Sequence, residues 1–260
     1  MISYFSVKLK LNMNIRKEIP NLLTLGNLFC GTIATIFAVQ GNFEGAALYV
    51  VIGIFFDFLD GFVARLLNVS GELGKQLDSL ADMVTSGVVP GIIISKLIQN
   101  NFLNSSKPFD DRFFDISLIG LIITLGACYR LAKFNIDTRQ SNSFIGLPTP
   151  AMCLFVISLP LIQKHTEIQF VLVLIGNDYF LIVLTVVLTY LMNAELPLFS
   201  LKFKDYSLKN NWITYLFLAI SFLLIITINY LSIPIIIILY ILLSIMKNIT
   251  PKIEHNEISN

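Results

Sequence analysis

Residues 55–84 read FFDFLDGFVARLLNVSGELGKQLDSLADMV and contain four aspartates in or beside apolar helical stretches. These are Asp57, Asp60, Asp78 and Asp82. An unpaired carboxylate near the centre of a bilayer costs about 2.5–3.5 kcal/mol, so four of them would cost on the order of 10 kcal/mol in addition to their mutual repulsion. A chain that keeps all four must therefore compensate their charge.

The spacing of the four aspartates predicts that their side chains converge. Asp57 and Asp60 are i, i+3 neighbours on one helix face, and Asp78 and Asp82 are i, i+4 neighbours on another. Only a short turn separates the two helices, which predicts antiparallel neighbours. Oxygen ligands without Cys or His nearby in the sequence suit a hard cation such as Mg²⁺ or Mn²⁺. Four carboxylates are more than one ion needs when substrate phosphates add further oxygens, which favours two divalent cations.

The composition of the whole chain indicates an all-α integral membrane protein. Of its 260 residues, 55% are hydrophobic and only 13% are charged, with a mean hydropathy of +0.77. A soluble domain of this length needs more surface charge, and a net charge of +1 leaves no basic patch for nucleic acid. About 20 apolar residues cross a bilayer as a helix. Eight ranges qualify as spans: residues 21–40, 46–67, 77–98, 115–134, 149–163, 169–194, 211–231 and 233–247.

The distribution of Lys and Arg predicts that both termini lie in the cytoplasm. Cytoplasmic segments of membrane proteins are enriched in these residues. With the N-terminus inside, 14 of the 18 Lys and Arg residues lie in cytoplasmic segments. The four in outer segments are Lys96, Lys107, Arg112 and Lys164. Residues 1–19 are basic but lack the long apolar core of a cleaved signal peptide, so we expect an amphipathic segment at the membrane surface.

Small and basic residues beside the aspartates indicate a ligand that contains phosphate. Gly61 leaves room for a flat base or a phosphate against the helix, and Ala64 lies one turn further along that face. Arg65 can bond phosphate oxygens through its forked guanidinium. Taken alone, Arg65 could equally be an anchor at the membrane interface. Four neighbouring carboxylates favour the phosphate-binding role.

Residues 57–82 contain the pattern Asp-x2-Asp-Gly-x2-Ala-Arg-x8-Gly-x3-Asp-x3-Asp, which resembles without gaps the signature of the CDP-alcohol phosphatidyltransferase family. The resemblance implies that the first three aspartates hold metal. It also implies that Asp82 holds metal and is the base that deprotonates the acceptor hydroxyl. Gly61, Ala64 and Arg65 would contact the cytidine and the pyrophosphate.

The same resemblance implies a domain organisation. The family is built on six membrane helices whose site opens to the cytoplasm. Residues 20–195 would form this core, after the basic juxtamembrane segment 1–19, and residues 196–260 would add two transmembrane helices and a short polar tail. The resemblance further implies a homodimer, and a multi-pass protein of the cell (inner) membrane whose active site faces the cytoplasm.

Three blocks narrow the choice of acceptor alcohol. They are IPNLLTLGNLFCG (Ile19–Gly31), GKQLDSLADMVTSGVVPG (Gly74–Gly91) and YRLAKFNID…FIGLPTPA (Tyr129–Ala151). These blocks resemble the membrane-embedded phosphatidylserine synthases. The resemblance implies CDP-diacylglycerol and L-serine as substrates, taken up at a membrane lipid surface, with phosphatidylserine and CMP as products. The loop FIGLPTP is rigid by composition, and no chemistry is assigned to it.

Polar residues within these blocks are candidates for contacts with the substrates. Asn21, Thr24 and Asn27 lie on nearby turns of the first span and could bond the nucleotide or its phosphates. Alternatively, Asn21 caps the helix and Thr24 bonds a neighbouring helix. Arg130 and Lys133, at i and i+3 near the cytoplasmic end of the fourth span, could receive the serine carboxylate. Their alternative role is to anchor the cytoplasmic end of that span.

Two other functions are compatible with parts of the pattern. A sibling transferase would use glycerol-3-phosphate or an inositol-type alcohol, but a phosphorylated acceptor favours more convergent basic residues than this chain offers. An ion transporter could also bear intramembrane aspartates. Transport favours charges near the bilayer midplane and an internal repeat, whereas these aspartates lie toward one face beside an Arg and no repeat is visible.

Overall fold

The computed structural model describes residues 2–69, 71–104, 116–137, 144–198 and 208–249, and nearly all of them are helical. The first helices are α1 (Ile2–Val39), α2 (Phe43–Leu66), α3 (Glu72–Asp82) and α4 (Val89–Asn104), with a π-helical segment, Met83–Val88, between the last two. The later helices are a 3-10 segment (Ile116–Leu121), α5 (Ile122–Ile136), α6 (Thr149–His165), α7 (Gln169–Ile175), α8 (Asp178–Asn193), α9 (Leu208–Ile228), a 3-10 turn (Asn229–Leu231) and α10 (Ser232–Ile249).

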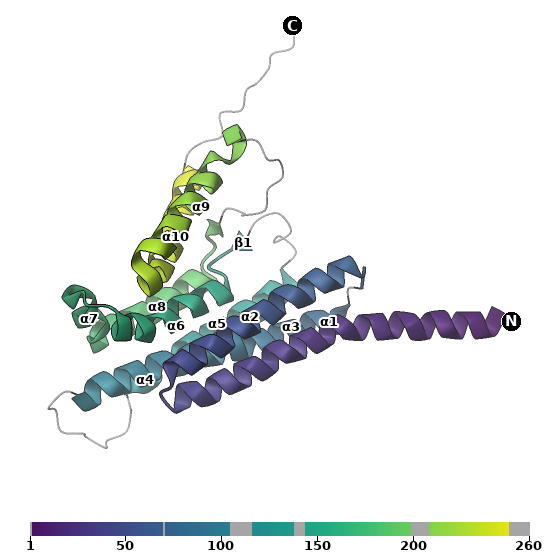
Figure 1. Ribbon diagram of the computed structural model, residues 1–260, viewed down its shortest axis with the longest axis horizontal. Helices are drawn as coiled ribbons and strands as arrows, with labels where there is room; N and C mark the ends of the chain where they lie inside the picture. The colour runs from purple at the N-terminus through teal and green to yellow at the C-terminus, as the bar shows by residue number, and fades with distance from the viewer. Residues whose placement is uncertain (1, 70, 105–115, 138–143, 199–207, 250–260) are drawn as a thin grey trace, which may run out of the picture.

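The helices form one bundle from which a hairpin projects. α1, α2, α4 and α5 lie roughly along a common direction, whereas α9 and α10 run steeply across it, and the N-terminal part of α1 extends beyond the bundle (Figure 1). Two short strands, β1 (Phe144–Ile145) and β2 (Pro197–Leu198), pair antiparallel with Phe144 opposite Leu198. This pairing ties the loop before α6 to the chain after α8.

Two tight turns set the order of the first three helices. Gly41 lies in the turn after α1 with a φ of 77°, in the left-handed region that glycine adopts without strain. Asn42 then caps α2, accepting a hydrogen bond from the Gly45 amide at 3.0 Å. After α2, Asn68 occupies the left-handed region with a φ of 52°. As a result α2 and α3 both pack on α1.

Five helical segments are long and apolar enough to cross a membrane, or six when α7 and α8 count as one bent span. The five are Glu18–Val39, Phe43–Leu66, Glu72–Asn101, Ile116–Ile136 and Asn211–Met246. The sequence predicts eight, and the difference has three sources. α6 is only 17 residues long, α7 and α8 meet at an angle of 73°, and the last segment contains two helices. The predicted cytoplasmic placement of the termini remains a prediction, and Lys107 and Arg112 lie outside the described residues.

The last apolar segment folds back on itself as a hairpin. The ring centroids of Phe217 and Tyr240 lie 5.8 Å apart, although these residues would be separated by about 34 Å along one straight helix. The chain turns at Asn229, whose φ is 47°, and the Ser232 hydroxyl donates to the Asn229 carbonyl at 2.5 Å. The predicted ranges 211–231 and 233–247 therefore correspond to two helices joined by a tight turn.

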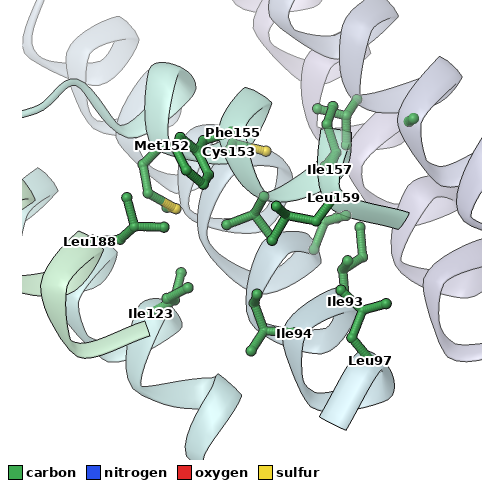
Figure 2. Close-up of a cluster of buried hydrophobic side chains, with 14 of the residues drawn as sticks. Ile93, Ile94, Leu97, Ile123, Met152, Cys153, Phe155, Ile157, Leu159 and Leu188 are labelled. Carbon is green, nitrogen blue, oxygen red and sulfur yellow. The ribbon is translucent and has the colours of Figure 1, made fainter. Parts of the chain in front are cut away.

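The buried core is centred on α6. Figure 2 shows its side chains meeting those of α4, α5 and α8. The contributing residues are Met152, Cys153, Phe155, Ile157 and Leu159 of α6, Ile93, Ile94 and Leu97 of α4, Ile123 of α5 and Leu188 of α8. By contrast, large apolar side chains such as Leu22, Phe58 and Phe222 are exposed on α1, α2 and α9, as expected of helices that face lipid.

Candidate active site

Three of the four aspartates form a compact cluster. One carboxylate oxygen each from Asp57 and Asp60 of α2 and from Asp78 of α3 lie within 4.8 Å of one another. Helical spacing puts the first two on one face of α2, and the short turn after α2 returns α3 beside them. Asp60 is buried, and the other two are partly buried. Such a concentration of negative charge must be relieved by a bound cation or by protonation.

Asp82 lies at the end of α3, next to this cluster. It is not among the three residues whose oxygens meet within 4.8 Å, but its charge interacts with those of the other three aspartates. The side-chain amide of Asn27 donates a hydrogen bond to Asp82 Oδ1 at 3.2 Å. The Thr85 hydroxyl lies 2.7 Å from Asn27 Oδ1, where it can donate to that oxygen and so orient the amide. These two hydrogen bonds, from Thr85 to Asn27 and from Asn27 to Asp82, therefore orient the Asp82 carboxylate.

The π-helical segment Met83–Val88 begins directly after Asp82. Single π turns within helices are rare and frequent at functional sites. Here the segment buries Thr85 completely against α1. A Cβ at Gly31 would lie 2.2 Å from Thr85 Oγ1, and one at Gly53 would lie 2.9 Å from both Thr85 Cγ2 and Asn27 Oδ1. Gly31 and Gly53 therefore let α1, α2 and the π-helical segment come close enough for the hydrogen bonds among Thr85, Asn27 and Asp82.

The first span supplies one direct contact to the cluster. The Thr24 hydroxyl lies 2.5 Å from Asp60 Oδ2 and 3.1 Å from the Pro20 carbonyl oxygen, so it can donate its single proton to either. Thr24 thus bonds a neighbouring helix, which is one of the two roles that the sequence leaves open. The Asn21 amide donates to Glu18 Oε2 at 3.2 Å. Asn27 is fully buried, with its amide bonded to Asp82.

An open cavity of about 440 Å³ adjoins Asp60 and Asp78. Its wall contains most of the residues that the sequence proposes for the CDP-linked lipid. The lining residues are Glu18, Pro20, Asn21 and Thr24 of α1, Asp60, Gly61 and Ala64 of α2, and Val69, Gly71, Glu72, Leu73, Gly74, Lys75 and Asp78 of the turn and α3. The cavity therefore brings carboxylates, glycines and small side chains together on one surface.

Arg65 lies beside this cavity, on the last turn of α2. Its guanidinium reaches back over Gly61, where an added Cβ would lie 3.7 Å from Nη1 and 3.9 Å from Nη2. The Arg65 side chain is otherwise exposed. A phosphate bound against Gly61 would therefore find a permanent positive charge within reach.

The two basic residues of α5 lie in different surroundings. Arg130 is only 8% exposed, donates from Nη1 to the Thr149 hydroxyl at 2.7 Å, and lies over the ring of Phe134 at 5.9 Å. Its charge interacts with that of Asp82. Lys133 is about one-third exposed and forms an ion pair with Glu195 at 3.7 Å. Arg130 is therefore the basic residue of α5 whose charge interacts with Asp82, and Lys133 pairs with Glu195.

Further contacts connect α3 to the end of α5. The Asn135 amide donates to the Ser79 hydroxyl at 2.8 Å, and the Lys75 ammonium donates to the Asn135 carbonyl. The sequence did not assign these contacts, the Thr85–Asn27 bond or the Arg130–Thr149 bond. All of these residues lie within the three blocks that resemble phosphatidylserine synthases. Membership of those blocks was the only indication, because the pairings depend on how the helices pack.

The donor set of the cluster fits a hard divalent cation. Within the part of the chain that the structure describes, the group consists of carboxylates alone, without Cys or His. Mg²⁺ and Mn²⁺ prefer such oxygen ligands, while zinc prefers nitrogen and sulfur. The adjoining cavity is large enough to admit further oxygen ligands from a substrate.

Comparison with known proteins finds similarity over most of the chain. Residues 17–191 match the family model for CDP-alcohol phosphatidyltransferases. A protein of Bacillus subtilis named CDP-diacylglycerol–serine O-phosphatidyltransferase is 35% identical over 146 residues, which cover 54% of this chain and 75% of that protein. A Helicobacter pylori protein of the same name is 36% identical over 147 residues, covering 56% of this chain and 58% of that protein.

The similarity reaches archaeal proteins as well. The archaetidylserine synthase of Methanothermobacter thermautotrophicus is 30% identical over 167 residues, covering 63% of this chain and 66% of that protein. The match thus spans three quarters of the Bacillus protein but under two thirds of the Helicobacter and Methanothermobacter proteins. The family match covers more than half of this chain and includes the helices that bear all four aspartates. The chain therefore belongs to the CDP-alcohol phosphatidyltransferase family.

Proposed function

We propose that this chain transfers the phosphatidyl group of CDP-diacylglycerol to the hydroxyl of L-serine, giving phosphatidylserine and CMP. The observation that carries this proposal is the cluster of Asp57, Asp60 and Asp78, of which Asp60 and Asp78 line a cavity together with Gly61 and Ala64. The names of the Bacillus and Helicobacter relatives support serine as the acceptor. The chain is then a membrane-embedded phosphotransferase of phospholipid biosynthesis.

The cavity beside α1 and α2 receives the head of the CDP-linked lipid. Gly61 and Ala64 leave space for the cytidine and its phosphates, and Arg65 neutralises phosphate charge. Asn21 and Thr24 line the same cavity, where the Asn21 side chain and the acceptor lone pairs of the Thr24 hydroxyl can bond the nucleotide. The acyl chains stay in the bilayer, against the exposed apolar faces of the first two helices.

Asp57, Asp60, Asp78 and Asp82 would hold two divalent cations, Mg²⁺ or Mn²⁺. When bound, these ions stabilise negative charge on the attacking and leaving oxygens of the phosphoryl transfer. Without cations the carboxylates repel one another, since oxygens of Asp57, Asp60 and Asp78 lie within 4.8 Å. The cations therefore also contribute to the stability of the site.

Asp82 accepts the proton of the serine hydroxyl. The hydroxyl oxygen forms a bond to the phosphorus that carries diacylglycerol, the bond from this phosphorus to CMP breaks, and the proton stays on Asp82. The amide of Asn27 holds the Asp82 carboxylate in a fixed direction. Arg130, close enough for its charge to interact with Asp82, binds the serine carboxylate. Lys133 would lie at the edge of this acceptor site.

The setting of the enzyme follows from the same proposal. We place it in the cell (inner) membrane with the active site facing the cytoplasm, because the basic residues are concentrated on that side. Residues 20–195 would act as the catalytic core and residues 196–260 as an added helical pair with a short tail. Assembly as a homodimer remains a prediction from the family resemblance.

The test is an assay of the purified chain in mixed lipid micelles. CMP release from CDP-diacylglycerol is measured with L-serine, glycerol-3-phosphate, inositol phosphate or no acceptor, each with Mg²⁺ or Mn²⁺. Only serine should support release, and the lipid product should carry the serine headgroup. Release with glycerol-3-phosphate or inositol phosphate instead would assign the chain to a sibling activity.

A further inference from the structure

Arg130 and Thr149 form a buried pair between α5 and α6. Arg130 is 8% exposed and Thr149 is not exposed at all. The guanidinium donates from Nη1 to the Thr149 hydroxyl at 2.7 Å. Nε of Arg130 is also buried, and no partner accepts its hydrogen bond among the described residues. A buried cation with an unused donor is costly, and an anion bound beside Arg130 would lower that cost.

Thr149 is fixed in place by the loop before it. Gly146 has a φ of 75°, and a Cβ there would lie 2.4 Å from the Met192 carbonyl oxygen. The Leu147 amide donates to the Leu191 carbonyl at 2.9 Å. Pro148 then precedes Thr149, the first residue of α6. The Thr149 hydroxyl is therefore presented from a rigid support, and the loop FIGLPTP acquires a role that its sequence did not reveal.

The other cation on α5 is engaged elsewhere. Lys133 pairs with Glu195 at 3.7 Å and is about one-third exposed. Arg130, in contrast, interacts electrostatically with Asp82. The proposed acceptor must then present an anion to Arg130 while its hydroxyl faces Asp82. The carboxylate of an amino-acid acceptor meets this requirement, since only two carbons separate it from the reacting hydroxyl oxygen.

We propose that Thr149 is a positioning residue that turns the Arg130 guanidinium toward the acceptor carboxylate and so makes the site selective for serine over alcohols without a carboxylate. The inference rests on the proposed serine transferase activity. Thr149 accepts one N–H of the guanidinium and thereby restricts its rotation. The N–H groups of the guanidinium that do not bond Thr149 would then be free to bind the carboxylate.

The experiment compares Thr149→Val, Thr149→Ser and wild type in the CMP-release assay. Two acceptors are used: L-serine, and ethanolamine at high concentration, which is serine without its carboxylate and whose low rate Thr149→Val should leave unchanged. Thr149→Val should raise the KM for serine about tenfold, the effect of one misplaced hydrogen bond to a charged group. The KM for CDP-diacylglycerol and the rate at saturating serine should change less than about twofold, because Thr149 acts on serine binding and not on the chemical step. Thr149→Ser, which keeps the hydroxyl that Arg130 bonds, should have the wild-type KM for serine.

Thr185→Val is the matched control. Thr185 is also fully buried, but its hydroxyl bonds the Leu181 carbonyl of its own helix at 2.7 Å. If valine at 149 prevents folding, Thr149→Ala takes its place, and a thermal melt in detergent establishes that each variant is folded.

Three results would overturn the proposal. The first is a Thr149→Val protein with the same serine KM as Thr185→Val. The second is an equal loss of rate with serine and ethanolamine at an unchanged serine KM, because Arg130 would then serve Asp82 alone. The third is a wild-type chain that releases no CMP with serine, which would remove the proposed function together with the inference. The wild-type control thus separates failure of the function from failure of the role of Thr149.

Discussion

At the scale of single residues, the site consists of carboxylates that would be costly in an apolar membrane helix without a function. Asp57, Asp60 and Asp78 meet within 4.8 Å, and Asp82 is directed by Asn27. The two kinds of environment suggest a division of labour. The clustered three could together hold a cation, whereas Asp82 is held by the Asn27 amide.

Asp82→Asn should therefore reduce serine-dependent CMP release by about 10²–10⁴-fold, the usual contribution of a general base. Nucleotide binding should persist, because the lining of the cavity does not include Asp82. Equilibrium binding of CDP measured beside the turnover assay separates the two effects. Asp178→Asn, at the start of α8, is the control, and normal turnover by Asp82→Asn would exclude the base role.

Asp57→Asn should act on cation affinity instead. Loss of one ligand charge should raise the Mg²⁺ or Mn²⁺ concentration for half-maximal activity by about tenfold or more, since even outer-shell partners alter metal affinity 10–100-fold. A titration of activity against each cation, after treatment with a chelator, measures this shift. An unchanged cation requirement would show that Asp57 is not a ligand.

At the scale of secondary-structure elements, the π-helical segment Met83–Val88 is the feature on which the geometry of Asp82 depends. It brings Thr85 into contact with α1, where only glycine at position 31 leaves room. Helix pairs in membranes commonly approach through such small residues. Here the close approach has a second consequence, because it connects Asn27 to Asp82.

Gly31→Ala should accordingly destabilise the fold. The new Cβ would lie 2.2 Å from Thr85 Oγ1 and 3.0 Å from the Thr85 backbone nitrogen, and overpacking of this kind costs about 1–3 kcal/mol. Gly26→Ala on the same helix meets only the Phe56 ring at 3.4 Å and should be neutral or mildly stabilising. Melting temperatures in detergent compare the two. Equal melting temperatures would mean that α1 and the π-helical segment separate easily.

At the scale of the whole molecule, the hairpin of α9 and α10 is distinct from the bundle that holds the site. The described part of the hairpin contributes no residue to the 440 Å³ cavity. It packs instead on α6 and β2 through residues such as Leu231, Ile233 and Ile237. We interpret it as a support for α6, the helix that begins with Thr149.

A chain ending at Leu198 should therefore retain serine-dependent CMP release but melt at a lower temperature. The loss of stability follows from exposure of the apolar surface of α6 that α10 covers, at about 25 cal/mol per Å². Activity and melting temperature of the truncated and full-length chains, purified in the same detergent, provide the comparison. Complete loss of activity in a truncated chain that is still folded would place part of the site in the last 62 residues, 199–260.

The sequence alone was sufficient for features that depend on local spacing. The i, i+3 and i, i+4 pairs of aspartates predicted a shared carboxylate site, because helix geometry fixes which side chains share a face. Composition predicted a helical membrane protein, and the signature between Asp57 and Asp82 predicted the family. Each of these inferences uses residues that are close along the chain or uses the chain as a whole.

Only the tertiary structure decided which residues, distant along the sequence, bond one another around the aspartate site. Thr85 bonds Asn27, 58 positions away, and Arg130 bonds Thr149, 19 positions away. The 73° bend between α7 and α8, inside the single predicted range 169–194, was likewise decided only by the structure. No pattern of hydrophobicity encodes such pairings, because they depend on which helix faces meet when small residues let the backbones approach.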